Sequence, residues 1–127
     1  MTLYFFDTNV IIDIFGQKKS ARFLSAQLAA SARFATSFVS VAEFLVKASS
    51  SEEKTLLAMI ADGELAVHPL DSVDLAKSAA QLRKTHSIKM PDALILASAR
   101  SLGAHFLSFD RDLIRVAKKV VAASIPE

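Results

Sequence analysis

Short apolar runs that do not alternate with polar residues constrain the fold of this chain more than any other feature. Four such runs, and a weaker fifth, cover residues 3–6, 34–36, 65–68, 105–108 and 120–123. Continuous apolar segments of this length are typical of strands in a parallel sheet, because helices cover both faces of such a sheet. We therefore predict about five parallel strands.

Helical patterns separate these runs, over residues 21–32, 41–48, 52–61, 75–85 and 91–102. Asp71 or Ser72 is a candidate N-cap for the fourth helix, and Pro91 opens the last one, where its missing N–H is not needed. The alternation of strands and helices predicts an α/β fold with three layers, the helices lying on both faces of the sheet. At 127 residues, the chain is expected to form a single domain over residues 1–127.

Composition excludes several classes of protein. No apolar stretch approaches the roughly 20 residues that a membrane-spanning helix needs, and the first residues do not resemble a signal peptide. The chain has no cysteine, which excludes disulfides and thiolate metal sites and fits a cytoplasmic protein. The net charge of +2 and the pI of 9.0 permit nucleic-acid binding without requiring it.

Four acidic residues follow the expected strands or lie early in an expected helix. Asp7 and Asp110 come just after apolar runs, whereas Glu43 and Asp92 belong to the apolar helical segments 41–48 and 91–102. Each acid alone is equally explained as a helix N-cap or as a favourable charge in a first helical turn. Because the carboxyl ends of parallel strands lie on one edge of a sheet, we expect the four acids to converge there.

Converging carboxylates repel one another, so either some of them stay protonated or a cation neutralises them. Oxygen ligands in a chain without cysteine favour Mg²⁺ or Mn²⁺ over zinc. The three histidines, at positions 68, 86 and 105, show no paired metal-ligand spacing. Such a site suits phosphodiester hydrolysis, because the metal can activate water and offset the charge that grows on the phosphate oxygens.

At these acids the sequence resembles the PIN-domain ribonucleases, and specifically the VapC-type toxins of bacterial and archaeal toxin–antitoxin pairs. The segment FFDTNVIIDI resembles the first motif of the family, with Asp7 as its acid and Asn9 as a supporting polar residue. SVAEFL is similar to the second motif through Glu43, and MPDALILASA to the third through Asp92. The order and spacing of the motifs agree over nearly the whole chain.

The fourth motif is matched by FLSFDRDL. Asp110 stands at the position of its acid, and Ser108 stands where the family usually has threonine or serine. Asp112 is the alternative fourth acid, and Asp110 is favoured because it lies closer to the end of the strand. Asp13, six residues after Asp7, is expected on the solvent-exposed face of its helix.

The resemblance implies endonucleolytic cleavage of RNA at an Mg²⁺ or Mn²⁺ site formed by Asp7, Glu43, Asp92 and Asp110. It also implies inhibition by a cognate antitoxin, and a homodimer. We expect the antitoxin to bind an apolar groove whose walls are residues 38–46 and 52–61.

Three cations are candidates for contacts with RNA phosphates. Lys47 lies four residues after Glu43, Arg111 adjoins Asp110, and Arg100 lies eight residues after Asp92. Each is equally explained as ordinary solvated charge.

Other families are less compatible with the motifs. A dehalogenase-type phosphotransferase needs a second aspartate two residues after the first, and Asn9 occupies that position. A response-regulator receiver needs an adjacent pair of acids and a lysine at a strand end, and neither is evident. The remaining alternatives are a PIN-like module that binds RNA or protein without cutting, and an RNA-processing nuclease outside a toxin–antitoxin pair.

Overall fold

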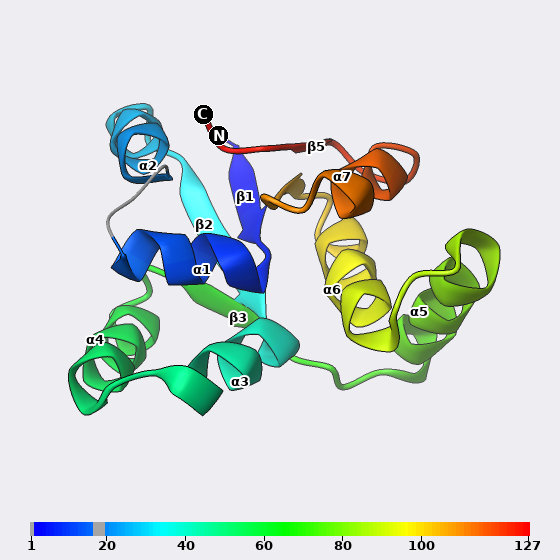
Figure 1. Ribbon diagram of the computed structural model, residues 1–127, viewed down its shortest axis with the longest axis horizontal. Coiled ribbons are helices and arrows are strands. Elements are labelled where there is room, and N and C mark those ends of the chain that lie inside the picture. Colours follow the sequence, from blue (N-terminus) through cyan, green and yellow to red (C-terminus); the bar gives the residue numbers. More distant parts are fainter. Residues whose placement is uncertain (1, 17–19) are drawn as a thin grey trace.

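The computed structural model describes residues 2–16 and 20–127, which form a five-stranded parallel sheet with helices on both faces (Figure 1). The order of the strands across the sheet is β3-β2-β1-β4-β5. The strands are β1 (Leu3–Phe6), β2 (Arg33–Ser37), β3 (Ala66–His68), β4 (His105–Leu107) and β5 (Ala123–Ser124). The predicted fold class is therefore confirmed.

The first strand is the central one, and its neighbours come from distant parts of the chain. Phe6, the last residue of β1, is paired with Thr36 of β2 and with Leu107 of β4. Because all pairs are parallel, the carboxyl ends of these three strands meet at one edge. Residues 7, 37 and 108, which follow the paired positions, are thereby brought side by side.

Seven helices belong to the described residues, and none has the length and apolarity needed to cross a membrane. Serine side chains fix several of their starts. Ser37 accepts a hydrogen bond from the Ser40 amide at 3.0 Å, which starts one helix three residues before the predicted position. Ser72, one of the two predicted caps, caps another. The helices are α1 (Thr8–Phe15), α2 (Ser20–Ala29), α3 (Phe38–Lys47), α4 (Ser50–Ala61), α5 (Val73–His86), α6 (Met90–Ser101) and α7 (Arg111–Ala117).

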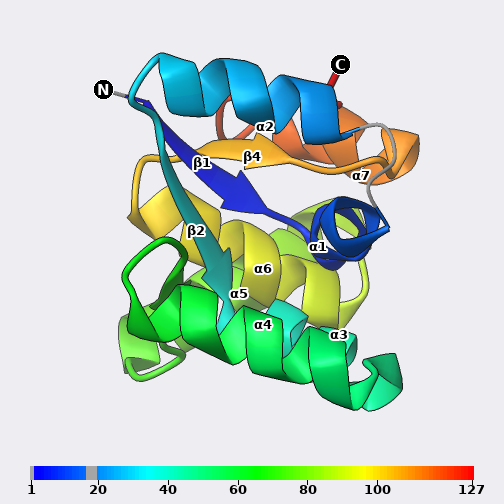
Figure 2. The same ribbon diagram turned by 90° about the vertical axis from the view of Figure 1, so that its left-hand side faces the viewer.

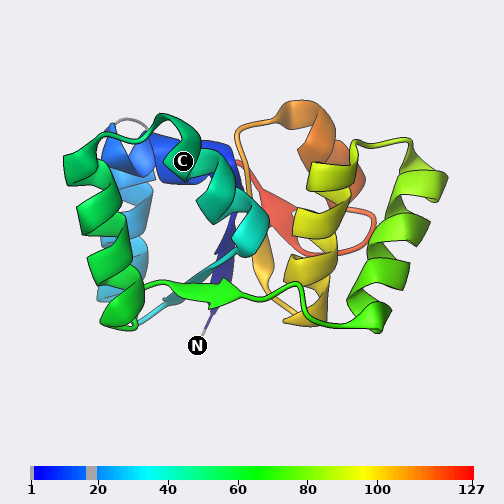
Figure 3. The same cartoon turned by 90° about the horizontal axis from the view of Figure 1, so that it is seen from below.

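Side chains that alternate along the strands build a separate core on each face of the sheet. Phe5 and Phe106 belong to the core beneath α5, α6 and α7, whereas Phe6 and Leu107 belong to the core beneath α1, α3 and α4. Seen from below, the two groups of helices stand on either side of the strands (Figure 3). All four residues are at most 3 % exposed, which explains why the strands read as continuous apolar runs.

The last strand lies later than predicted. Residues 120–123 were expected to form it, but β5 is Ala123–Ser124. The amides of Val120 and Val121 both donate to the Ala117 carbonyl, at 2.9 and 2.8 Å, so these valines still belong to the turn that closes α7. Their side chains pack against the core from that turn, which accounts for their apolar character.

Candidate active site

Asp7 follows β1 directly and is almost fully buried, with 6 % of its surface exposed. One carboxylate oxygen, Oδ1, accepts the Thr8 amide at 2.8 Å, so Asp7 does cap α1. The other oxygen, Oδ2, accepts the Ser108 hydroxyl at 2.7 Å and the Asn9 side-chain amide at 3.3 Å. The cap explanation thus accounts for one oxygen only, because the second is bonded by Asn9 of α1 and by Ser108, which follows β4.

Asn9 and Ser108, the two expected supporting residues, join the ends of β1 and β4. The Asn9 Nδ2 donates to the Ser108 hydroxyl at 3.1 Å, and the Asn9 Oδ1 accepts the Phe109 amide at 3.0 Å. The Ser108 hydroxyl in turn accepts the Asp110 amide at 3.0 Å. These bonds hold Asp7 and the start of α7 in a fixed relation.

Glu43 projects from the exposed side of α3 toward α1. Its Oε1 accepts the Thr8 hydroxyl at 2.6 Å, and the same hydroxyl lies 3.1 Å from the Ser40 hydroxyl. Thr8 therefore ties the second acid to the first strand end, a role that the sequence reading missed. Its place between Asp7 and Asn9 in the first motif was the available signal.

Asp92 lies in the first turn of α6, two residues after the start of that helix. Burial raises its pKa, and the neighbouring charges of Asp110 and Glu43 raise that pKa further, whereas Lys89 lowers it. Lys89 is the N-cap residue of α6, and the sequence reading missed it as well.

Burial also raises the pKa of Asp7, to about 6. The hydrogen bonds from Ser108 and Thr8 oppose this increase, and the charges of Asp92 and Glu43 add to it. Since Asp92 also senses the charge of Asp110, the four predicted acids form one electrostatic group, which we call the acid cluster: Asp7, Glu43, Asp92 and Asp110.

Asp110 and Asp112, the two alternatives for the fourth acid, have different surroundings. Asp110 caps α7, and its Oδ1 accepts the amides of Asp112 and Leu113 at 3.0 and 3.1 Å. The Asp112 carboxylate forms an ion pair with Arg115 at 2.9 Å, and its side chain is 85 % exposed. Of the two, Asp110 is the acid whose charge acts on Asp92.

Asp13 does not lie free on the solvent-exposed face of α1, as the sequence suggested. It is half-buried, and its Oδ2 accepts both the amide and the hydroxyl of Ser20, the amide at 2.6 Å. The expectation was wrong because an acid on α1 meets the start of α2, whose Ser20 hydroxyl is fully buried and needs an acceptor.

The donor set of the acid cluster fits a hard divalent cation. All four side chains offer carboxylate oxygens, and the mutual repulsion that adds to the effect of burial on the pKa values of Asp7 and Asp92 is relieved when a cation binds. Within residues 2–16 and 20–127, no three acidic or histidine side chains stand ready to enclose a metal by themselves. Mg²⁺ is commonly held by one or two carboxylates and keeps several waters, so a partial set of protein ligands suits it.

The structure separates the three candidate RNA contacts. Arg111 adjoins Asp110 and, with Asn9, lines a hollow beside the acid cluster. Lys47 is exposed at the last position of α3. Arg100 is not brought to the acids, because it lies near the other end of α6 and lines a different hollow with His68. Eight residues of helix place it roughly 12 Å along the axis from Asp92.

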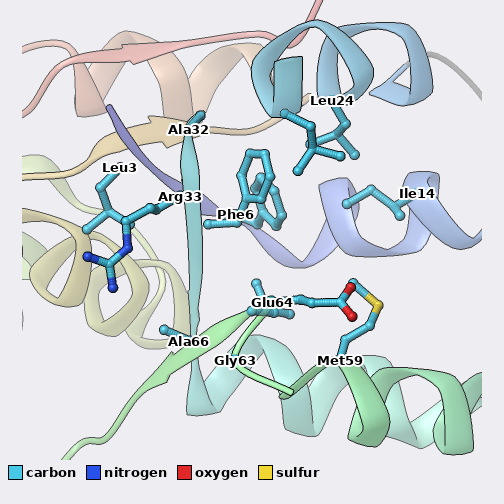
Figure 4. A pocket seen from close by; sticks show the side chains of 13 residues that line it. Leu3, Phe6, Ile14, Leu24, Ala32, Arg33, Met59, Gly63, Glu64 and Ala66 are labelled. Atoms are coloured by element: carbon cyan, nitrogen blue, oxygen red, sulfur yellow. The ribbon is translucent and has the colours of Figure 1, made fainter. Parts of the chain in front are cut away.

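An apolar hollow of about 400 Å³ opens on the face that carries α1, α2 and α4. Figure 2 looks onto this face, with α2 and α4 on opposite sides of the strands, and Figure 4 shows the lining side chains. Met59 comes from α4, but α3 contributes nothing to the lining, so only one of the two expected groove walls, residues 52–61, takes part. The lining also includes Phe6, Ile14, Leu24, Leu28, Arg33, Phe34 and Glu64.

Solved structures similar to this one include several toxin–antitoxin assemblies. A toxin–antitoxin complex from Klebsiella pneumoniae matches with a TM-score of 0.75 at 26% identity, over 100% of this chain and 98% of the other. VapBC2 from Rickettsia felis, bound to a DNA fragment from its promoter, also has a TM-score of 0.75, at 18% identity over 99% and 100% of the two chains. VapBC-1 from nontypeable Haemophilus influenzae has the same TM-score, at 15% identity over 98% of both chains.

No protein with a curated description matches the chain. The model of the PIN domain family, by contrast, matches residues 4–119, a range that includes all four residues of the acid cluster. The chain therefore belongs to the PIN domain family.

Proposed function

We propose that the protein is an Mg²⁺- or Mn²⁺-dependent endoribonuclease and the toxin of a type II toxin–antitoxin pair. The observation that carries this proposal is the acid cluster, four carboxylates that act on one another at the carboxyl edge of the sheet. Membership of the PIN domain family supports a nuclease. In this proposal residues 1–127 form a single nuclease domain that acts on RNA in the cytoplasm.

Each acid has a distinct part in the proposed site. Asp7 and Asp92 would be the inner ligands of the metal, because they are the acids whose pKa values burial raises. Glu43 and Asp110 would complete its surroundings, directly or through water. When bound, the metal supplies an activated water and neutralises charge on the phosphate oxygens.

Other side chains hold these acids in place. Ser108 and Asn9 fix Oδ2 of Asp7, and the Thr8 amide fixes Oδ1, so the carboxylate cannot rotate away. The Thr8 hydroxyl orients Oε1 of Glu43 in the same way. Ligands oriented by such hydrogen bonds keep their geometry when charge develops in the transition state.

Cleavage of RNA with and without metal tests the proposal directly. The wild type should cut single-stranded or loop RNA with Mg²⁺ or Mn²⁺ and lose this activity in EDTA. Asp7→Asn should remove activity, and Asp112→Asn should retain it, since Asp112 is paired with Arg115 away from the cluster. Undiminished cleavage by the wild type in EDTA would rule out the metal mechanism, and RNA binding without any cleavage would favour a binding module.

We further propose that a cognate antitoxin covers the apolar hollow between α2 and α4. The similar structures from Klebsiella pneumoniae and Rickettsia felis are complexes of toxin with antitoxin, and the hollow is apolar with Leu28 63 % exposed at its rim. Leu28→Glu should abolish the complex with the antitoxin encoded beside this gene while leaving nuclease activity intact. A stable complex in this variant would place the antitoxin elsewhere. The homodimer stays a prediction, which sedimentation of the purified chain tests.

A further inference from the structure

A corner between two helices carries positive charge close to the acid cluster. Besides His86, residues 75–91 contain four lysine or arginine residues, Lys77, Arg83, Lys84 and Lys89, and no acidic residue. The last three gather where α5 ends and α6 begins, and α5 and α6 run side by side in Figure 1. We call Arg83, Lys84 and Lys89 the basic corner.

The basic corner has a defined shape. Ser87 ends α5 in the left-handed conformation, with φ of 56°, and turns the chain into α6. The Arg83 Nη1 donates to the Ile88 carbonyl at 2.9 Å, which fixes this turn. Beside the turn is a hollow of about 440 Å³, lined by Ala80, Arg83, Lys84, Ser87, Ile88 and Met90.

No ion pair neutralises the charges of the corner within the part of the chain that the structure describes. Within the described residues, the only ion pair joins Arg115 and Asp112, so no carboxylate is paired with Arg83, Lys84 or Lys89. All three side chains are exposed. Unpaired cations grouped beside a hollow are available to an anionic ligand.

The corner also adjoins the acid cluster. Lys89 is the N-cap residue of α6 and Asp92 lies in the first turn of the same helix, close enough for the lysine charge to act on the carboxylate. Met90, between them, is 40 % exposed. A strand of RNA that places a phosphate at Asp92 therefore passes next to the corner.

We propose that the basic corner holds the RNA strand on one side of the cut, with backbone phosphates on Lys84 and Lys89 and a base against Ile88 and Met90. This inference rests on the proposed function, since it assigns part of the substrate path of the same site. Four carboxylates repel an approaching phosphate chain, so cations immediately beside them are needed to retain it. An acidic peptide would find the same charges, but only a nucleic-acid strand has to pass both the corner and the cluster.

The test is a binding measurement in which cleavage plays no part. A fluorescent single-stranded RNA is titrated with protein in EDTA at several salt concentrations. The variant Lys84→Gln/Lys89→Gln leaves Arg83 and its bond to Ile88 in place, so the turn is kept. The control, Lys118→Gln/Lys119→Gln, removes the same charge from exposed residues after α7.

The corner variant should bind RNA about tenfold or more weakly at low salt, and the control should bind as the wild type does. The slope of log K against log salt should become shallower by about 1.4, at about 0.7 for each of two phosphate contacts on a single strand. An affinity and slope equal to those of the control would overturn the proposal. If the corner variant binds RNA as the control does but binds the antitoxin more weakly, the corner is a binding surface for a protein partner and the proposal fails.

A second arm separates this inference from the proposed function. With Mn²⁺, Lys84→Gln alone, which leaves Lys89 beside Asp92, should cut a long RNA more slowly than the wild type does, but cut a dinucleotide too short to reach Lys84 at the wild-type rate. An equal loss on both substrates would mean that the substitution damages the acid cluster, and would overturn the corner as a binding surface. If the wild type binds RNA through the corner but cuts nothing, the proposed nuclease fails while the corner stands.

Discussion

The inner and outer halves of the acid cluster are built differently. Asp7, 6 % exposed, and half-buried Asp92 are the acids whose pKa values rise through burial. Glu43 and Asp110 are exposed, and each is held by a neighbouring hydrogen bond: Glu43 by the Thr8 hydroxyl, and Asp110 by the first amides of α7.

Because of this difference, the inner acids and Asp110 affect the stability of the metal-free protein in opposite directions. The inner acids destabilise the metal-free fold, because their charged forms are desolvated and repelled. The outer acid Asp110 stabilises the fold as a helix cap, whether or not metal is bound. The four acids should therefore respond differently to the same loss of charge, which the following experiments measure.

The largest difference between the inner and outer acids should be in the rate of RNA cleavage. Asp7→Asn and Asp92→Asn should each lower the cleavage rate at saturating Mn²⁺ by more than about a hundredfold, since even residues that only orient metal ligands cost 10–100-fold. Glu43→Gln and Asp110→Asn should lower it by about tenfold, because water can replace an exposed ligand. Rates that fall equally in all four variants would remove the distinction between inner and outer acids.

The next largest effect should be on the pH dependence of the unfolding free energy, which Asp7→Asn should change. Its pKa is 3.8 as a free side chain and about 6 in the folded protein. The folded state therefore favours the protonated Asp7 carboxyl. This contribution to the free energy of unfolding is fully present below pH 3.8 and is lost as the pH rises through about 6. In EDTA, Asp7→Asn should therefore be more stable than the wild type at pH 8, by about 2–3 kcal/mol, with little difference near pH 4. Urea unfolding across this range measures it, and a difference independent of pH would contradict the assignment.

The cap at Asp110 should give a smaller effect of opposite sign. Asp110→Ala removes the acceptor for two amides of α7 and should cost about 1 kcal/mol of unfolding free energy. Asp110→Asn keeps an acceptor oxygen and should cost much less, although both variants lose the charge. Thermal unfolding in EDTA separates them. If the alanine variant is instead stabilised, repulsion outweighs the cap and Asp110 belongs with the inner acids.

The smallest effect should come from the Thr8 hydroxyl. Thr8→Val keeps the shape of the side chain but removes the donor to Glu43, so cleavage should fall severalfold while stability changes by about 1 kcal/mol or less. Thr55→Val is a matched control, because its hydroxyl donates only to a carbonyl one turn earlier on exposed α4. Equal rates in the two variants would show that Thr8 does not position Glu43.

The main strand ends could be predicted from the sequence, because local patterns determine them. The carboxyl edge follows from apolar runs that end before Asp7 and Asp110, and this was enough to group the acids. Contacts between distant segments could not be predicted in this way. Asp13 of α1 meets Ser20 at the start of α2, and the Thr8 hydroxyl meets Glu43 of α3.

The bond between Asn9 and the Phe109 amide joins positions 100 residues apart, and this has a consequence for the order of folding. β1 is made first, but one of its two edges has no partner until residues 105–107 of β4 arrive. Contacts between such distant positions form late, because the chain between them must first lose its freedom. During synthesis, therefore, Asp7 has no Ser108 to hold it until most of the chain has left the ribosome. A chain of this topology has no assembled site while it is still being made.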